Sequence, residues 1–307
     1  MERKKMERKR IRDFGIVPGV MKTGPKNKIT DVPGVLVGHK TVRSGDSRTG
    51  VTVIVPGPGN VFDRKFIAAG YVHNGFGKTC GLVQVEELGT LETPIALTNT
   101  LNVGLAADAL VEYTIRQFAK EQVEVTSVSP VVGECNDCKI NRIQHRAVSM
   151  EDVMEAFSRA DEDFEEGDVG AGTGTVCYGL KGGIGSASRI MRIGGKKYTL
   201  GVLVQSNFGA TEDLVINGIR AGERILEEKE RRRKMAAQLA NLAVTAEGLT
   251  VVVKTEENAR EMERLIPYTK DYPVPDTGEL FYLCVGHECM QPVPQLEQLI
   301  QKLREET

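Results

Sequence analysis

The alternation of apolar and polar positions predicts many short strands with a few helices between them. The ranges expected as strands are 29–41, 51–55, 81–88, 94–98, 123–132, 175–178, 198–204, 249–253 and 280–284. The ranges expected as helices are 105–120, 149–160, 225–242, 256–265 and 295–304. Because the strands do not alternate strictly with helices, the pattern favours an α+β fold over a doubly wound sheet.

The most distinctive stretch is glycine-rich and runs from residue 170 to 188. Glycine allows positive φ angles and lets another backbone or a ligand approach closely. Lys181 falls at a turn of this stretch, where its charge can face a cleft, and Asn207 follows the strand expected at 198–204. Both are candidate site residues. The alternative interpretation is that these glycines form ordinary hairpin turns.

Composition excludes several classes of function. The chain has 307 residues, is 40% hydrophobic and 27% charged, carries a net charge of −2 and lacks tryptophan. These values indicate a globular protein with no preference for nucleic acid, and no run of apolar residues is long enough for a membrane span. The basic stretch 1–12 lacks the apolar core of a signal peptide, so we expect a cytoplasmic protein. A nucleic-acid-binding arm is the alternative.

Cysteine and histidine residues offer weaker signals. Cys135 and Cys138 form a C-x-x-C pair, which is compatible with redox chemistry or with zinc binding. The additional zinc ligands would be Cys284, His287 or Cys289. Because the spacing of this second set is irregular, we interpret the cysteines as thiols and expect neither a metal nor a cofactor. His39, His73 and His145 are expected to be hydrogen-bonded structural residues.

Several motifs in order resemble one known family. The sequences are GTGTVCYGLKGGIGSASR at 172–189 and YTLGVLVQSNFG at 198–209, with further agreement at 29–39, 69–75, 94–104 and 130–135. Together they are similar to the DmpA-type aminopeptidases, which include β-peptidyl aminopeptidases. The resemblance implies a four-layer αββα sandwich and hydrolysis of an amide next to a free amine in a small peptide or amide substrate. It also implies a homo-oligomer, with Asn207 donating to the oxyanion and Lys181 supporting the site charge.

The resemblance implies two parts, a first-subunit scaffold at 1–225 and an atypical tail at 226–307. Family members cleave themselves, and the new N-terminal serine or threonine is the nucleophile. Here Gly248 occupies the expected position, Thr250 lies two residues late and Thr245 three residues early. The nucleophile is therefore unassigned, with Thr250 as a weak candidate. The tail resembles the C-terminus of YyaL-type proteins that carry a thioredoxin-like domain.

Three hypotheses follow from the missing hydroxyl. The first is an aminopeptidase or amidase that is inactive as an isolated chain, because a glycine can supply neither the attacking group nor the base. The second is a non-catalytic scaffold, or a subunit that pairs with a separate chain. The third is an acyltransferase of the ornithine acetyltransferase fold group.

Overall fold

The computed structural model describes residues 9–119, 124–245, 254, 258–265, 267–275, 278–285 and 288–306. The chain divides into two compact units, Met1–Arg224 and Ile225–Thr307. The assignment of the two parts as a first-subunit scaffold and an atypical tail stays a prediction.

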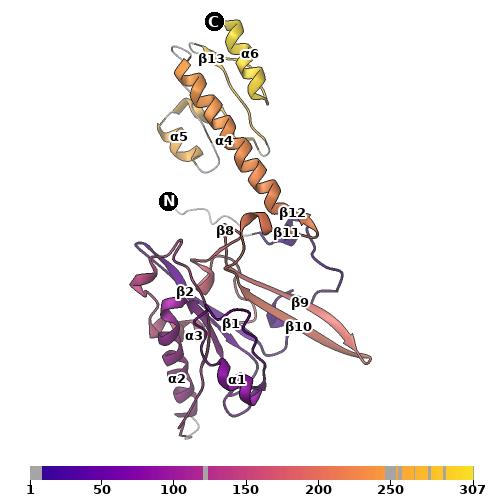
Figure 1. Ribbon diagram of the computed structural model, residues 1–307, viewed down its shortest axis with the longest axis vertical. Coiled ribbons are helices and arrows are strands. Elements are labelled where there is room, and N and C mark those ends of the chain that lie inside the picture. The colour runs from indigo at the N-terminus through magenta and orange to yellow at the C-terminus, as the bar shows by residue number, and fades with distance from the viewer. Residues whose placement is uncertain are drawn as a thin grey trace. The chain divides into compact units, whose positions relative to one another are not determined.

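The first unit contains most of the strands (Figure 1). Its strands are β1 Leu36–Ser44, β2 Ser47–Val55, β3 Phe66–Ile67, β4 Thr90–Leu91, β5 Ile95–Asn99, β6 Val131–Cys135, β7 Val176–Cys177, β8 Leu180–Lys181, β9 Ile184–Ile193, β10 Lys196–Gln205, β11 Val215–Ile216 and β12 Ile219–Arg220. Its helices are α1 Leu82–Leu88, α2 Val103–Ala119 and α3 Met150–Ser158. Its short 3-10 helices are η1 Ile11–Phe14, η2 Ile29–Asp31, η3 Thr100–Asn102, η4 Ile143–His145, η5 Gly170–Gly172 and η6 Thr211–Asp213.

The central sheet has the strand order β1-β2-β5-β6. β1, β2 and β5 pair antiparallel, whereas β5 and β6 are parallel, with Asn99 opposite Cys135 at their shared end. Because parallel strands finish at one edge of a sheet, the residues that follow β5 and β6 are brought together. This edge positions the candidate site.

One face of the central sheet packs against helices α2 and α3. The core on this side contains Val53 of β2, Leu110 of α2 and Val153 of α3, all fully buried. Successive strand residues point to opposite faces, so Ile54 packs on the other side. That second core also contains Ile184 of β9. The first unit is therefore layered as helices, sheet and hairpin.

The long antiparallel hairpin β9–β10 forms the third layer. Its register pairs Ile184 with Gln205 and Ile193 with Lys196, and its tip projects from the rest of the unit (Figure 1). The strand expected at 198–204 is confirmed as part of β10, whereas no strand was expected at 184–193, where β9 lies. The result is an α+β layered fold, in which α2 and α3 pack on one face of the sheet and α1 packs against Ile95 and Val131.

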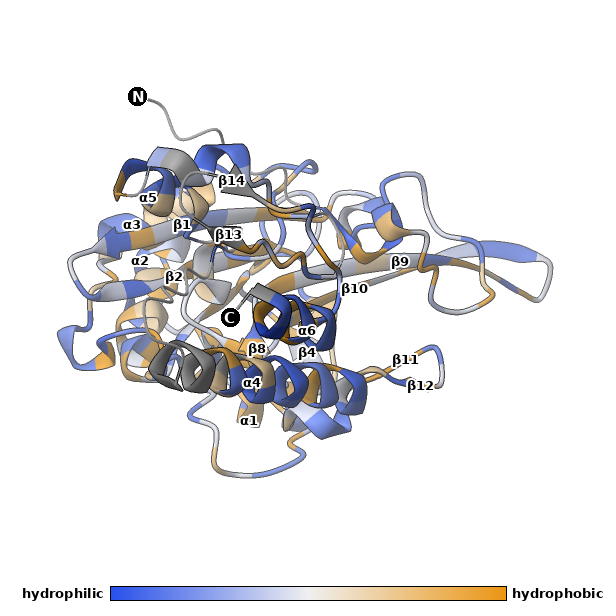
Figure 2. Cartoon of the chain, turned by 90° about the horizontal axis from the view of Figure 1, so that it is seen from above, coloured by the Kyte–Doolittle hydropathy of each residue, from blue (hydrophilic) through white to orange (hydrophobic). Residues whose placement is uncertain are grey.

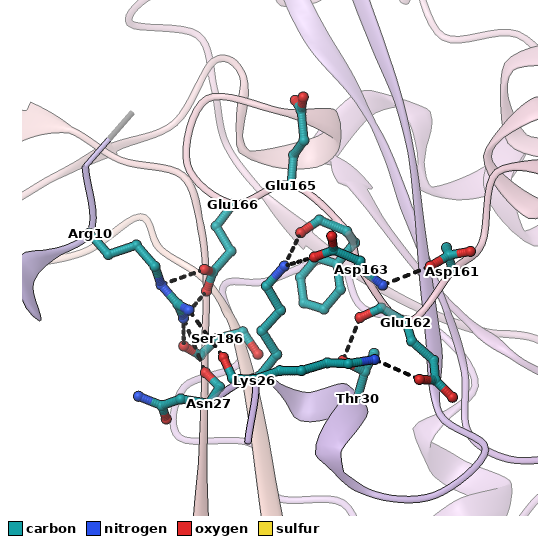
Figure 3. A network of polar contacts seen from close by, with 12 residues as sticks. Arg10, Lys26, Asn27, Thr30, Asp161, Glu162, Asp163, Glu165, Glu166 and Ser186 are labelled. Carbon is teal, nitrogen blue, oxygen red and sulfur yellow. Dashed lines mark hydrogen bonds and ion pairs between the residues drawn. The ribbon is translucent and has the colours of Figure 1, made fainter. Parts of the chain in front are cut away.

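The segment before η2 is fastened to the hairpin and to the acidic loop 161–168 (Figure 3). The Arg10 guanidinium lies 2.7 Å from the Glu166 carboxylate and donates to the Ser186 carbonyl at 2.9 Å. Lys28 Nζ pairs with Asp163 at 2.7 Å, and this contact lowers the pKa of the Asp163 carboxyl. The acidic loop thus holds the N-terminal segment in place.

Some predicted elements differ from the structure. The strand expected at 81–88 is wrong, because this segment is helix α1. Gly81 and Gly89 adopt left-handed φ angles of 84° and 66° and bracket a helix in which Leu82 and Val85 face the core. The strand expected to begin at residue 29 begins at Leu36, and the strand expected at 123–132 begins at Val131.

The second unit is mostly helical. Its helices are α4 Ala221–Thr245, which begins just before the unit boundary, α5 Ala259–Leu265 and α6 Leu296–Glu306. The 3-10 helix η7 spans Pro267–Asp271, and β13 Cys284–Val285 pairs with β14 Glu288–Cys289.

A small apolar core holds the second unit together, built around Leu283, Leu296 and Leu299. The coloured part of α4 is largely hydrophilic (Figure 2), with Glu228 paired to Arg231 and Arg232. None of the described helices is both long enough and apolar enough for a membrane span. The strand expected at 249–253 lies outside the described residues.

Candidate functional site

Polar side chains meet where β5 and β6 end. Asn99 caps η3 by accepting hydrogen bonds from the backbone amides of Leu101 and Asn102, each at 3.1 Å. The half-buried Glu134 carboxylate accepts from the Lys78 amide at 2.9 Å and from the Thr100 hydroxyl. An ionised carboxylate has about four acceptor sites, so two bonds fix Glu134 and leave it able to accept more.

The end of β10 reaches the same edge. The Gln205 side-chain amide donates to the Thr98 carbonyl at 3.1 Å and to the Ala171 carbonyl at 3.0 Å. The Cys135 thiol lies 3.6 Å from the Gln205 carbonyl oxygen. Gln205 therefore joins the hairpin to the central sheet, two residues before Asn207. Asn207 is half-buried, and its side chain has no hydrogen-bond partner among the residues that the structure describes.

Lys181 is held by backbone oxygens. Its Nζ donates to the carbonyls of Gly172 and Gly182 at 2.8 Å and of Thr175 at 3.2 Å, and lies 3.8 Å from the Asp168 carboxylate. This arrangement fastens the turns of the glycine-rich stretch around a cation. The bond from the Ser206 amide to the Gly183 carbonyl, at 3.0 Å, places these turns beside the Asn207 segment. That Lys181 and Asn207 face one cleft stays a prediction.

A strained turn lies next to Asn207. Tyr178 and Gly179 join β7 to β8 with φ angles of 52° and 65°, the left-handed pair typical of a type I′ turn. An aromatic residue rarely adopts this conformation, and such strain is concentrated at functional sites. The Tyr178 amide donates to the Phe208 carbonyl at 2.7 Å, and the two rings meet edge to face at 5.2 Å. The turn therefore anchors the residue that follows Asn207.

The Cys135 thiol at this edge is not a thiolate at neutral pH. Burial raises the pKa of the Cys135 thiol to about 12, with the negative charges of Glu134 and Asp137 adding to it. Cys135 is therefore protonated and cannot serve as a thiolate nucleophile. Cys80, Cys138 and Cys177 are also free. Among the described residues, no three His, Cys, Asp or Glu side chains are placed to hold a metal ion.

His39 is a structural residue, as expected. Its Nδ1 lies 2.9 Å from the Thr52 hydroxyl and its Nε2 lies 3.0 Å from the Glu165 carbonyl oxygen. Burial lowers the pKa of this imidazole to about 4. His145 similarly lies 3.2 Å from the Ser47 hydroxyl. These hydrogen bonds account for two of the three histidines that lacked metal-ligand spacing in the sequence.

Glu134 and Tyr178 were not predicted as site residues. The segment 130–135 was recognised as a motif, and a carboxylate at the end of a buried strand was the signal for Glu134. Tyr178 gave no comparable signal, because its positive φ is visible only in three dimensions. Gly248 and Thr250, the expected and substitute nucleophile positions, lie outside the described residues, and Thr245 is the last residue of α4.

Comparisons with known proteins agree on one family. Residues 27–266 match the family described as Peptidase family S58. A curated relative, the β-peptidyl aminopeptidase BapA of Sphingosinicella xenopeptidilytica, is 40% identical over 227 residues, covering 70% of this chain and 56% of the relative.

Solved structures show the same fold. The PH0078 protein from Pyrococcus horikoshii OT3 is 52% identical with a TM-score of 0.67, covering 70% of this chain and 63% of that protein. The L-aminopeptidase D-Ala-esterase/amidase of Ochrobactrum anthropi, described as a variant of the Ntn hydrolase fold, is 35% identical with a TM-score of 0.65. That match covers 70% of this chain and 62% of that one. The chain thus spans less than two thirds of each relative, and over most of its own length it belongs to Peptidase family S58.

Proposed function

We propose that this chain provides the substrate-binding part of an aminopeptidase or amidase that hydrolyses an amide next to a free amine. The observation that carries the proposal is the fixed Glu134 carboxylate at the shared end of β5 and β6. The family membership and the names of the relatives, which are aminopeptidases, support the same class of reaction.

Glu134 would recognise the free amine. A substrate ammonium requires a negatively charged acceptor, and hydrogen bonds between ionised groups are roughly twice as strong as neutral ones. Glu134 is already oriented by Lys78 and Thr100, so little conformational freedom is lost when the ammonium binds. The high pKa of the neighbouring Cys135 thiol keeps that group neutral, so it adds no second charge.

Asn207 would donate to the amide oxygen of the substrate. Its side-chain amide carries two N–H donors and follows directly on the segment that Gln205 and Ser206 tie to the rest of the site. Loss of one oxyanion donor typically reduces turnover by about 10²- to 10³-fold. Lys181 acts here as a positioning residue, because its Nζ holds the carbonyls of the surrounding turns.

The isolated chain would bind substrate without turning it over. The Cys135 thiol of the site stays protonated, and glycine occupies the position expected for the nucleophile. A subunit that pairs with a separate chain is the alternative to a self-sufficient enzyme.

A binding experiment tests the proposal. Alanine amide and β-alanine amide are titrated into the chain, and binding is followed by saturation-transfer NMR. Both should bind to the wild type, and the N-acetylated amides, which lack the ammonium, should not. Glu134→Gln keeps the shape but removes the charge and should weaken binding about tenfold or more, equivalent to one charged hydrogen bond. Equal binding of the free and acetylated amides would refute the role of Glu134.

A further inference from the structure

A hollow in the first unit is lined mainly by cationic side chains. It has a volume of about 470 Å³, and its lining includes Asp46, Arg48, Lys139, Asn141 and Arg142. Lys139 and Arg142 form no ion pair with any residue that the structure describes. Asp46, the one carboxylate of the lining, is exposed to solvent. Because three cations face a single carboxylate, the hollow favours an anion.

The half-buried Arg48 is held with one side of its guanidinium available. Its Nη1 donates to the Gly45 carbonyl at 2.6 Å and to the Ser47 carbonyl at 2.8 Å. Within the described part of the chain, its Nε and Nη2 have no acceptor. These two donors lie on the same side of the planar guanidinium and match the two oxygens of a carboxylate. Arg48 is therefore oriented before any anion binds.

The turn beside the hollow is also fixed. The Asn141 side chain, which is 5% exposed, accepts from the Arg48 backbone amide at 2.9 Å and donates to the Asp137 carboxyl at 2.9 Å. The Arg142 amide donates to the Asp46 carbonyl at 3.2 Å. These bonds join the turn that carries Arg142 to the turn between β1 and β2. A site that is formed in advance loses little conformational freedom on binding.

The hollow lies at the edge of the sheet that carries Glu134. The register of β2, β5 and β6 places Glu134 level with Val51, three residues from Arg48. β5 alone separates β2 from β6, so the backbones of Arg48 and Glu134 lie roughly 10 Å apart across the sheet and roughly 10 Å apart along it, or roughly 14 Å in all. The two side chains shorten this separation. An extended peptide of three or four residues spans about 10–14 Å.

We propose that this hollow binds the carboxylate of a short peptide whose amino group is held by Glu134. The substrate is then a peptide of three or four residues with a free C-terminus, and the same peptide with a C-terminal amide binds less well. The part played by Glu134 rests on the proposed function. The preference of the hollow for an anion rests on the charges and hydrogen bonds of Arg48, Lys139 and Arg142.

A pair of peptides that differ in one charge tests the proposal. β-Alanyl-triglycine and its C-terminal amide are titrated into the full chain, and binding is followed by NMR. The wild type should bind the free acid about tenfold more tightly, equivalent to one charged hydrogen bond, and added salt should reduce this preference. β-Alanyl-glycine spans only about 7 Å and should bind no more tightly than its own amide, because it is too short to reach both charges.

Substitutions locate the preference. Arg48→Gln removes the guanidinium and should reduce the preference for the free acid to within about twofold, because the bidentate contact is lost. Arg142→Gln should reduce it in the same direction, whereas Glu134→Gln should weaken binding of both peptides. Arg192→Gln, on β9 and outside the hollow, is the matched control and should keep the full preference. Circular dichroism and melting temperature establish that each variant folds.

The outcomes separate this proposal from the proposed function. Equal binding of the two peptides by the wild type, or an undiminished preference in both Arg48→Gln and Arg142→Gln, overturns the anion site. If the preference depends on Arg48 but Glu134→Gln binds like the wild type, the anion site stands and the proposed function fails. If both peptides require Glu134 and the free acid has no advantage, the anion site fails and the proposed function stands. Absence of binding by either peptide contradicts both.

Discussion

The three carbonyl contacts of Lys181 lead to a quantitative prediction. Lys181→Met keeps the length of the side chain and removes the cation that joins Gly172, Thr175 and Gly182. A hydrogen bond to a charged group contributes about 1.5–3 kcal/mol when it is well buried. Lys181 remains 39% exposed, so each bond is worth less than that range.

Two of the three carbonyls keep another donor when Lys181 is replaced. The Gly172 oxygen also accepts from the Thr175 hydroxyl at 3.1 Å, and the Thr175 oxygen accepts from the Gly182 amide at 2.9 Å. We therefore expect the free energy of unfolding to fall by about 2 kcal/mol, near the worth of one charged bond. For a unit of this size the melting temperature should fall by roughly 4–8 °C.

Differential scanning calorimetry on Lys181→Met measures this loss. Lys197→Met is the matched control, because Lys197 is exposed on the hairpin and makes no hydrogen bond among the described residues. It should change stability by less than about 0.5 kcal/mol. A Lys181→Met protein as stable as the control would refute the fastening role, and Lys181 would then be free to serve the substrate.

Two further predictions concern pH. Arg10→Met removes the ion-pair partner of the mostly buried Glu166. Burial already raises the pKa of the Glu166 carboxyl, and without Arg10 that pKa would rise further. The free energy of unfolding measured in urea should therefore fall by about 2–3 kcal/mol, with a larger loss at pH 8 than at pH 5, and an equal loss at both pH values contradicts the ion pair. The pKa of His39 is about 4 in the folded state and near 6.5 in the unfolded state. The contribution of His39 to the free energy of unfolding is therefore complete above pH 6.5 and falls by about 2 kcal/mol toward pH 4.5. His39→Gln keeps a partner for Thr52 and should lose less stability over that interval, whereas an unchanged pH dependence would show that His39 does not control it.

The sequence predicted the layers better than the short elements. The strand expected at 198–204 followed from its β-branched and apolar residues and is confirmed within β10, but its partner β9 at 184–193 was not predicted. Helix α1 was missed because Leu82, Val83 and Val85 have the composition of a strand. The left-handed φ angles of Gly81 and Gly89, which bracket the helix, are known only from the structure. Local composition does not report which of two backbone states the surrounding contacts select.

The site was only partly predictable for a related reason. Asn207 and Lys181 were identified from the family motifs, and their joint cleft stays a prediction. Glu134 became a candidate only when the parallel pairing of β5 with β6 placed it beside Thr100. The second hydrogen-bond donor to its carboxylate is the backbone amide of Lys78, which is distant in the sequence. The YyaL-type resemblance of the tail, the cytoplasmic location and the homo-oligomeric state also stay predictions.

The central claim is that this chain holds a substrate site without a working nucleophile. Intact mass spectrometry after incubation with β-alanyl p-nitroanilide, with p-nitroaniline release followed in the same sample, tests it most directly. We predict an undivided chain of 33.6 kDa, no covalent adduct and no release. A cleaved chain with a new N-terminal threonine at position 245 or 250, and turnover that its replacement by alanine abolishes, would contradict the account.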